Sequence, residues 1–163
     1  MIDNKINNAN EPEIINVDLG YVEKKKFAIN GDINRLLELN VSDLNAIKRY
    51  NEASPKLEAF MQDVQKELAK TEEEEDENLS KISEVLTKID KEMRDCIDYI
   101  FDTNASEICA PSGNMFDPVN GQFRYEHIIE CLSKLYAEGI GEEFKKMKNN
   151  TSKYTSKYTK KKK

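Results

Sequence analysis

The stretch that decides the fold is residues 82–101, ISEVLTKIDKEMRDCIDYIF. Its apolar side chains recur at alternating spacings of four and three residues, the pattern of a helix that packs lengthwise on another helix. The members of this seam are Ile82, Leu86, Ile89, Met93, Cys96 and Ile100. Charged residues occupy the opposite face, and no Gly or Pro interrupts the stretch. The segment is therefore predicted to form one long amphipathic helix.

This helix cannot be stable by itself. Burial of the six seam side chains contributes roughly 10–18 kcal/mol, at about 1.5–3 kcal/mol for each side chain. Ordering the backbone of twenty residues costs about 20–40 kcal/mol. The seam therefore requires helical partners, either from the same chain or from another copy.

Composition favours a small helical protein. The chain has 163 residues, of which 38% are hydrophobic and 34% charged, with no Trp and six Gly. The net charge of −6 conceals an asymmetry, because residues 144–163 contain nine Lys and no acid. The rest of the chain has 16 basic and 31 acidic residues and a net charge of −15. Such an acidic body argues against nucleic-acid binding.

Three widely spaced cysteines do not suggest a disulfide framework, so reduced thiols are expected. The N-terminal residues MIDNKINNAN lack the apolar core of a signal peptide. No apolar run approaches the length of a membrane span. The sequence therefore predicts a cytoplasmic protein that neither enters nor crosses a membrane.

The N-terminal third is predicted to contain a short β element. Residues 1–12 are polar and rich in Asn, and disorder is expected there. Apolar and polar residues then alternate in 14–19, which predicts a half-buried strand. Further strands are expected at 27–29 and 35–39, with Asn30-Gly31 as the turn between them. Together these segments predict a three-stranded meander.

A helical hairpin is predicted to follow. Ser42 is the expected N-cap of a helix over 43–70, in which Pro55 marks either a restart or a kink. The acidic run TEEEEDEN at 71–78 has no apolar face and is expected to be an exposed loop between antiparallel helices. A single continuous coiled coil is the alternative.

The C-terminal third is predicted to contain a packed loop and one more helix. Residues 102–121 are rich in turn-forming residues but also contain apolar side chains, so the loop should pack down. An amphipathic helix over 125–136 should weaken or end near Gly139 and Gly141. Disorder is expected in the Lys-rich tail, 149–163. The prediction is one mainly α domain over 13–148.

Candidate chemistry is sparse. Cys96, Cys109, His127 and Cys131 are the best zinc ligand set, and His127 and Cys131 share a helical face. However, there is no CxxC pair, and Cys96 belongs to the apolar seam. With a single His and no GxSxG turn, no acid–base set can be named. We therefore expect a non-enzymatic protein without catalytic, cofactor-binding or metal-binding residues.

Two stretches resemble a known family. They are KFAINGDINRLLELNVSDLNAIKRYNEA at 26–53 and IDYIFDTNASEICAPSGNMFDPVNGQFRYEHIIECLSKLYAEGI at 97–140. Both are similar to the tail-assembly chaperones of long-tailed bacteriophages that infect Gram-positive hosts. The resemblance spans about residues 20–148 and lies in the order of parts, since no motif in it is catalytic.

The resemblance implies a non-catalytic chaperone that binds the phage tape-measure protein, and the tail tube protein is a further candidate partner. It would act in the host cytoplasm and be absent from the mature virion. The alternative is a structural tail component that forms homo-oligomers through its helical seams. Apolar side chains of the first helical region are the expected partner-binding residues: Leu44, Ile47, Tyr50, Leu57, Met61 and Val64.

Overall fold

The computed structural model describes residues 14–20, 22–71 and 77–159, which form a mainly α fold with a small N-terminal sheet. The predicted fold class is thus confirmed. In chain order, the described elements are β1 (Lys25–Ala28), the 3-10 helix η1 (Ile29–Gly31), β2 (Leu36–Leu39), α1 (Asn45–Thr71), α2 (Glu77–Phe101), α3 (Ala105–Cys109), β3 (Pro118–Val119), β4 (Gln122–Phe123) and α4 (Arg124–Thr159).

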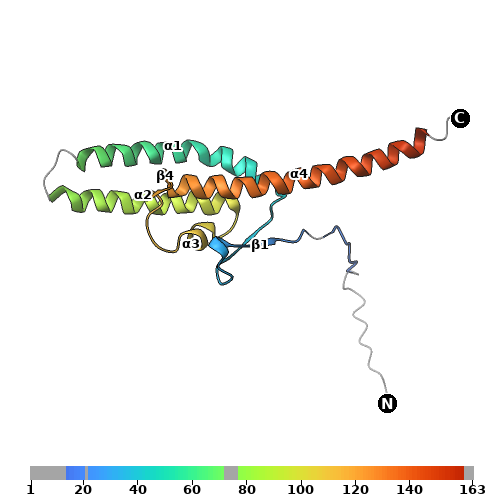
Figure 1. Ribbon diagram of the computed structural model, residues 1–163, viewed down its shortest axis with the longest axis horizontal. Helices are drawn as coiled ribbons and strands as arrows, with labels where there is room; N and C mark the ends of the chain where they lie inside the picture. Colours follow the sequence, from blue (N-terminus) through green and yellow to red (C-terminus); the bar gives the residue numbers. More distant parts are fainter. Residues whose placement is uncertain (1–13, 21, 72–76, 160–163) are drawn as a thin grey trace, which may run out of the picture.

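Helices α1 and α2 pack side by side as an antiparallel hairpin (Figure 1). The seam of α2 is buried apart from Leu86, which is half-buried, and α1 contributes Leu57 and Val64 to the same core. The predicted hairpin is therefore confirmed, and the alternative of one continuous coiled coil is wrong. Helix α1 ends at Thr71 and helix α2 begins at Glu77, so residues 72–76 of the predicted acidic loop lie outside the described residues.

Helix α1 begins slightly later than predicted and is not interrupted. The cap is Asp43 rather than Ser42, because the Asp43 carboxylate accepts the Asn45 N–H at 2.9 Å. The Ser42 hydroxyl instead donates to the Asn40 side chain at 3.1 Å. Pro55 lies inside one continuous helix, which excludes a separate second helix after Ser54.

The N-terminal sheet has two strands rather than three. β1 and β2 pair antiparallel with Phe27 opposite Leu37, and Leu37 and Leu39 are fully buried. Asn30 and Gly31 have positive φ as predicted, although the connection is longer than a two-residue turn. The strand predicted at 14–19 does not form, because its apolar side chains contact no core. Residues 1–12 lie outside the described part of the chain.

The segment after α2 packs down, as predicted, and contains the short helix α3. Asp98 of α2 accepts the Ser106 N–H at 2.7 Å and the Ser106 hydroxyl at 3.0 Å. At the other end of α3, the Arg35 guanidinium donates to the carbonyls of Ile108 and Cys109 at 2.8 and 3.0 Å. These contacts satisfy the peptide groups at both ends of a helix too short to be stable alone.

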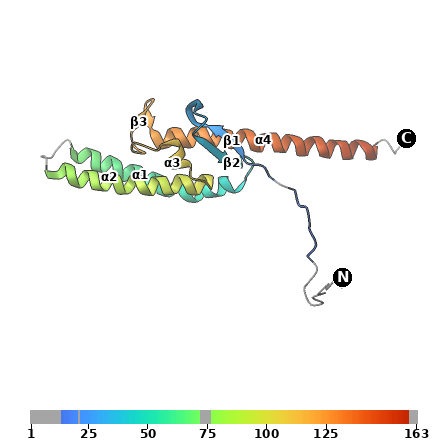
Figure 2. The same cartoon turned by 90° about the horizontal axis from the view of Figure 1, so that it is seen from below.

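Helix α4 lies along the hairpin and continues beyond it (Figures 1 and 2). It passes through Gly139 and Gly141, so of the two predicted outcomes, a weakened helix or a helix that ends there, the second is wrong. A Cβ at Gly139 would lie 2.6 Å from both the Val41 Cγ2 and carbonyl O atoms, which shows that this glycine permits close packing. Residues 142–159 contain no Gly or Pro, and α4 continues to Thr159 where disorder was expected from residue 149.

Candidate partner-binding grooves

A groove runs between α1 and α4. It consists of two cavities of about 400 and 140 Å³, and Tyr50 and Ser133 line both of them. The wall on α1 extends from Ile47 to Met61, a length of about 21 Å at a rise of 1.5 Å per residue. This α1–α4 groove is thus long enough for three to four turns of a docked helix.

The floor of the α1–α4 groove is apolar and aromatic. Leu57 and Tyr125 are buried in it, and Met61 and Ile129 are half-buried. The Tyr125 hydroxyl lies 3.4 Å from the Met61 sulfur, a contact that holds the two walls together. Burial raises the pKa of Tyr125 to about 12, so its hydroxyl stays neutral at physiological pH. The floor therefore offers apolar contact area without a charge.

The rim of the α1–α4 groove is acidic. Its charged lining residues are Glu58, Glu126 and Glu130. Glu126 accepts the Phe123 N–H at 2.9 Å and so caps the start of α4, while Glu130 pairs with Lys134 at 2.9 Å. An apolar floor with an acidic rim suits an amphipathic helix whose apolar stripe is flanked by Lys or Arg.

The structure divides the predicted partner-binding residues into two groups. Leu44, Ile47 and Tyr50 are exposed, and Ile47 and Tyr50 line the α1–α4 groove. Met61 and Leu57 line it deeper down, Leu57 as part of the core. Val64 is completely buried. The stripe on α1 is therefore a free surface at its N-terminal end and internal core further along.

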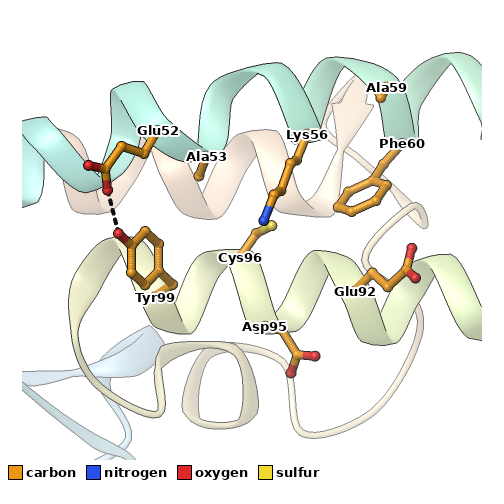
Figure 3. Close-up of a pocket in the computed structure, with 9 residues that line it drawn as sticks. All are labelled: Glu52, Ala53, Lys56, Ala59, Phe60, Glu92, Asp95, Cys96 and Tyr99. Carbon is orange, nitrogen blue, oxygen red and sulfur yellow. Dashed lines mark hydrogen bonds between the residues drawn. The ribbon is translucent and has the colours of Figure 1, made fainter.

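A second groove, of about 600 Å³, lies between α1 and α2 (Figure 3). The space exists because small residues, Ala53 on α1 and Cys96 on α2, face each other across the hairpin. Lys56 extends over Cys96, and a hydrogen bond from the Tyr99 hydroxyl to Glu52 bridges the helices at one end. The lining of this groove is also net acidic, with Glu52, Glu92 and Asp95 against one Lys, so its charge does not distinguish it from the α1–α4 groove. What distinguishes it is obstruction, because the Lys56 side chain lies across its middle and the Tyr99–Glu52 hydrogen bond spans one end.

The Cys96 thiol in the α1–α2 groove is not activated as a nucleophile. Burial raises the pKa of Cys96, and the opposing effect of the Lys56 charge does not compensate. The hydrogen bond to Glu52 likewise raises the pKa of Tyr99. Both groups are therefore protonated at neutral pH, which leaves no nucleophile among them.

The proposed zinc ligands are only partly brought together. His127 and Cys131 share a face of α4, as predicted, with Nε2 and Sγ 3.8 Å apart. Cys109 lines one cavity together with His127 and Cys131, between β1 and α4, but Cys96 is buried in the hairpin. Within the described ranges, no three His, Cys, Asp or Glu side chains are arranged to hold a metal ion.

Sequence reasoning missed the polar side chains that hold the fold together. Arg94 lies among the charged residues opposite the seam, where exposure to solvent is expected, yet it donates to the Ala110 and Gly113 carbonyls at 2.9 Å each and pairs with Asp90 at 3.0 Å. Asp90 also accepts the Met115 N–H at 2.6 Å. The spacing of Asp90 and Arg94 indicates an ordinary surface ion pair, and nothing local reveals the distant loop they bind.

The fold is that of a mainly α protein with a helical hairpin. Comparison with known proteins does not assign it to a family. No protein-family model, curated protein or solved structure matches the chain. In the part of the chain that the structure describes, no helix is long and apolar enough to cross a membrane.

Proposed function

We propose that this protein is a non-catalytic chaperone of phage tail assembly that binds the tape-measure protein through the α1–α4 groove. The observation that carries the proposal is a groove whose α1 wall is about 21 Å long and whose larger cavity combines an apolar floor with an acidic rim. Such a groove accepts an amphipathic helix lengthwise and extends the bundle by one member. The choice of the tape-measure protein as client rests on the resemblance of residues 26–53 and 97–140.

The charge distribution supports a chaperone. A client with long apolar helices aggregates unless its apolar stripes are covered and its complex carries net charge. Outside residues 144–163, this chain has a net charge of −15. Complexes of this protein with its client would therefore repel one another and stay soluble until the tube subunits assemble around the client. Under this proposal, the protein acts in the host cytoplasm and is absent from the finished particle.

The rival proposal is a structural tail component that oligomerises through the seam of α2. Five of the six seam residues are buried within a single chain, against α1 and the core around it. That surface is occupied before a second copy arrives. Abundance of the protein in purified phage particles would nevertheless support the structural role.

The test is co-expression with the tape-measure protein of the same phage, followed by pull-down. The wild-type chain should keep the client soluble and co-purify with it. A double variant, Ile47→Glu with Tyr50→Glu, places charge in the groove at positions that are already exposed and should lose both effects. Ile33→Glu, at an exposed position in the β1–β2 connection, is the matched control and should behave as wild type.

A client that is equally soluble alone and never co-purifies would contradict the chaperone function. Binding that the groove variant leaves intact would contradict the assignment to the α1–α4 groove.

A further inference from the structure

Residues 14–19, here called the N-terminal arm, are rich in apolar side chains but belong to no helix or strand of the fold. Its four apolar side chains are 68–95% exposed, and the arm extends away from the body in both views (Figures 1 and 2). Ile15, Val17 and Leu19 alternate with polar residues, as in a strand that buries one face. An extended segment of this kind can add to the exposed edge of a β-sheet as an additional strand.

β1 offers such an edge. In the described residues it pairs only with β2, so its other side lacks ladder hydrogen bonds. The Ile29 N–H donates to the Arg35 carbonyl at 3.0 Å, which points Ile29 toward β2. Because peptide groups alternate along an antiparallel strand, the N–H groups of Lys26 and Ala28 point to the free edge.

An apolar cavity lies beside this edge. Its volume is about 340 Å³, and it is lined by β1 and η1 residues on one side, by α4 on the other, and by Cys109 of α3. Phe27 and Ile29 face Ile128, Leu132 and Leu135 there, and none of the described β2 residues takes part. A strand added to β1 would therefore place alternate side chains over this cavity.

The charges of the arm and of β1 are complementary. Residues 6–23 contain four acids and no base, whereas Lys24, Lys25 and Lys26 follow directly. Within the arm itself Asp18 is the one charged residue, and Lys25 and Lys26 pair with Glu142 at 3.5 Å and with Glu38 at 3.4 Å, both exposed and therefore weak pairs. Because each copy carries both the arm and the edge, two copies can exchange arms reciprocally.

We infer that the N-terminal arm of one copy pairs with the free edge of β1 in a second copy, covering the cavity between β1 and α4. Pairing within one chain is disfavoured by the connection. Val22 and Glu23 lie beside Gly139 and Glu142 of α4, and Lys25 pairs with Glu142 at 3.5 Å. This path leads the arm away from the edge of its own β1.

The test is sedimentation of the full chain over a range of concentrations, with amide exchange at Lys26 and Ala28. The wild type should associate into dimers, and the two amides should become protected as dimers form. Val17→Lys should weaken dimerisation at least about tenfold, because an ammonium group cannot enter an apolar cavity without loss of hydration. Ile33→Lys is the control, since Ile33 is 77% exposed and lies outside the arm.

A second readout is the alkylation of Cys131, which is exposed and lines the cavity. Dimerisation should slow it in the wild type but not in Val17→Lys. A wild type that remains monomeric would overturn the inference. So would protection of Lys26 and Ala28 that is independent of concentration, since the arm would then fold onto its own chain. Equal dimerisation of the wild type and Val17→Lys would place the interface elsewhere.

This inference does not depend on the proposed chaperone function. The arm and the β1 edge share no residue with the α1–α4 groove. Loss of dimerisation in Val17→Lys and loss of client in the groove variant are therefore separate results.

Discussion

The seam of α2 and the N-terminal arm are both regular apolar patterns, yet they have opposite fates. The seam repeats every three or four residues and is buried against α1, whereas the arm alternates every second residue and is exposed. Periodicity reveals which side chains share a face, but whether that face is covered depends on a partner. The difference separates residues that stabilise the monomer from those available to other molecules.

The largest effect should come from the seam. Met93 is completely buried at its centre, so Met93→Ala should lower the free energy of unfolding by about 2–5 kcal/mol. Urea denaturation followed by circular dichroism measures this. A loss below about 0.5 kcal/mol, typical of a surface site, would show that α2 does not pack through its seam.

The next effect concerns the two glycines of α4. Gly139→Ala should destabilise the protein by about 1–3 kcal/mol, because the new Cβ would lie 2.6 Å from the Val41 carbonyl O. Gly141→Ala is the matched control, since no neighbouring atom lies within 4 Å of its added Cβ. It should stabilise the helix by up to about 1 kcal/mol. The same sign for both variants in thermal unfolding would contradict the close packing of Val41.

A smaller, pH-dependent effect is expected at the start of α1. Burial alone would raise the pKa of Asp43, but hydrogen bonds from the Asn45 N–H and Arg49 outweigh it and lower the pKa below its usual 3.8. Asp43→Ala should cost about 1 kcal/mol at neutral pH. Because the folded pKa is the lower one, this contribution is present above pH 3.8 and is lost as the pH falls through the folded value.

Unfolding free energies measured at neutral pH and at successively lower pH check this. The difference between wild type and Asp43→Ala should shrink at acidic pH. A difference that does not change with pH would show that the carboxylate charge does not support the cap.

The smallest effect is expected in the arm. Ile14→Ser should change the stability of the monomer by no more than about 0.5 kcal/mol, since Ile14 is 95% exposed. The measurement requires dilute protein, in which the monomer predominates. A loss as large as that of Met93→Ala would mean that the arm belongs to the core of its own chain.

Local patterns in the sequence were sufficient to predict the framework of the fold. The seam spacing predicts α2 and its need for a partner, and the acidic run predicts the hairpin. The paired burial of Leu37 and Leu39 follows from their alternation. Each of these features depends on residues near one another in the chain.

The features that sequence reasoning got wrong depend on distant contacts. Gly139 looks like a helix terminator until Val41 is found against it. Arg94 looks like a surface residue until the Ala110 and Gly113 carbonyls are found at its guanidinium. The groove residues Ile47 and Tyr50 were predicted, but their opposing wall on α4 was not. No local signal shows which helices will face each other.

Binding in the α1–α4 groove is tested most directly by the hydrogen-exchange footprint of a tape-measure helix on this protein. We expect slowed exchange in residues 47–61 of α1 and 125–136 of α4, with no change around Cys96 and Tyr99 in the α1–α2 groove. Protection confined to the α1–α2 groove, or no protection at saturating peptide, would contradict it.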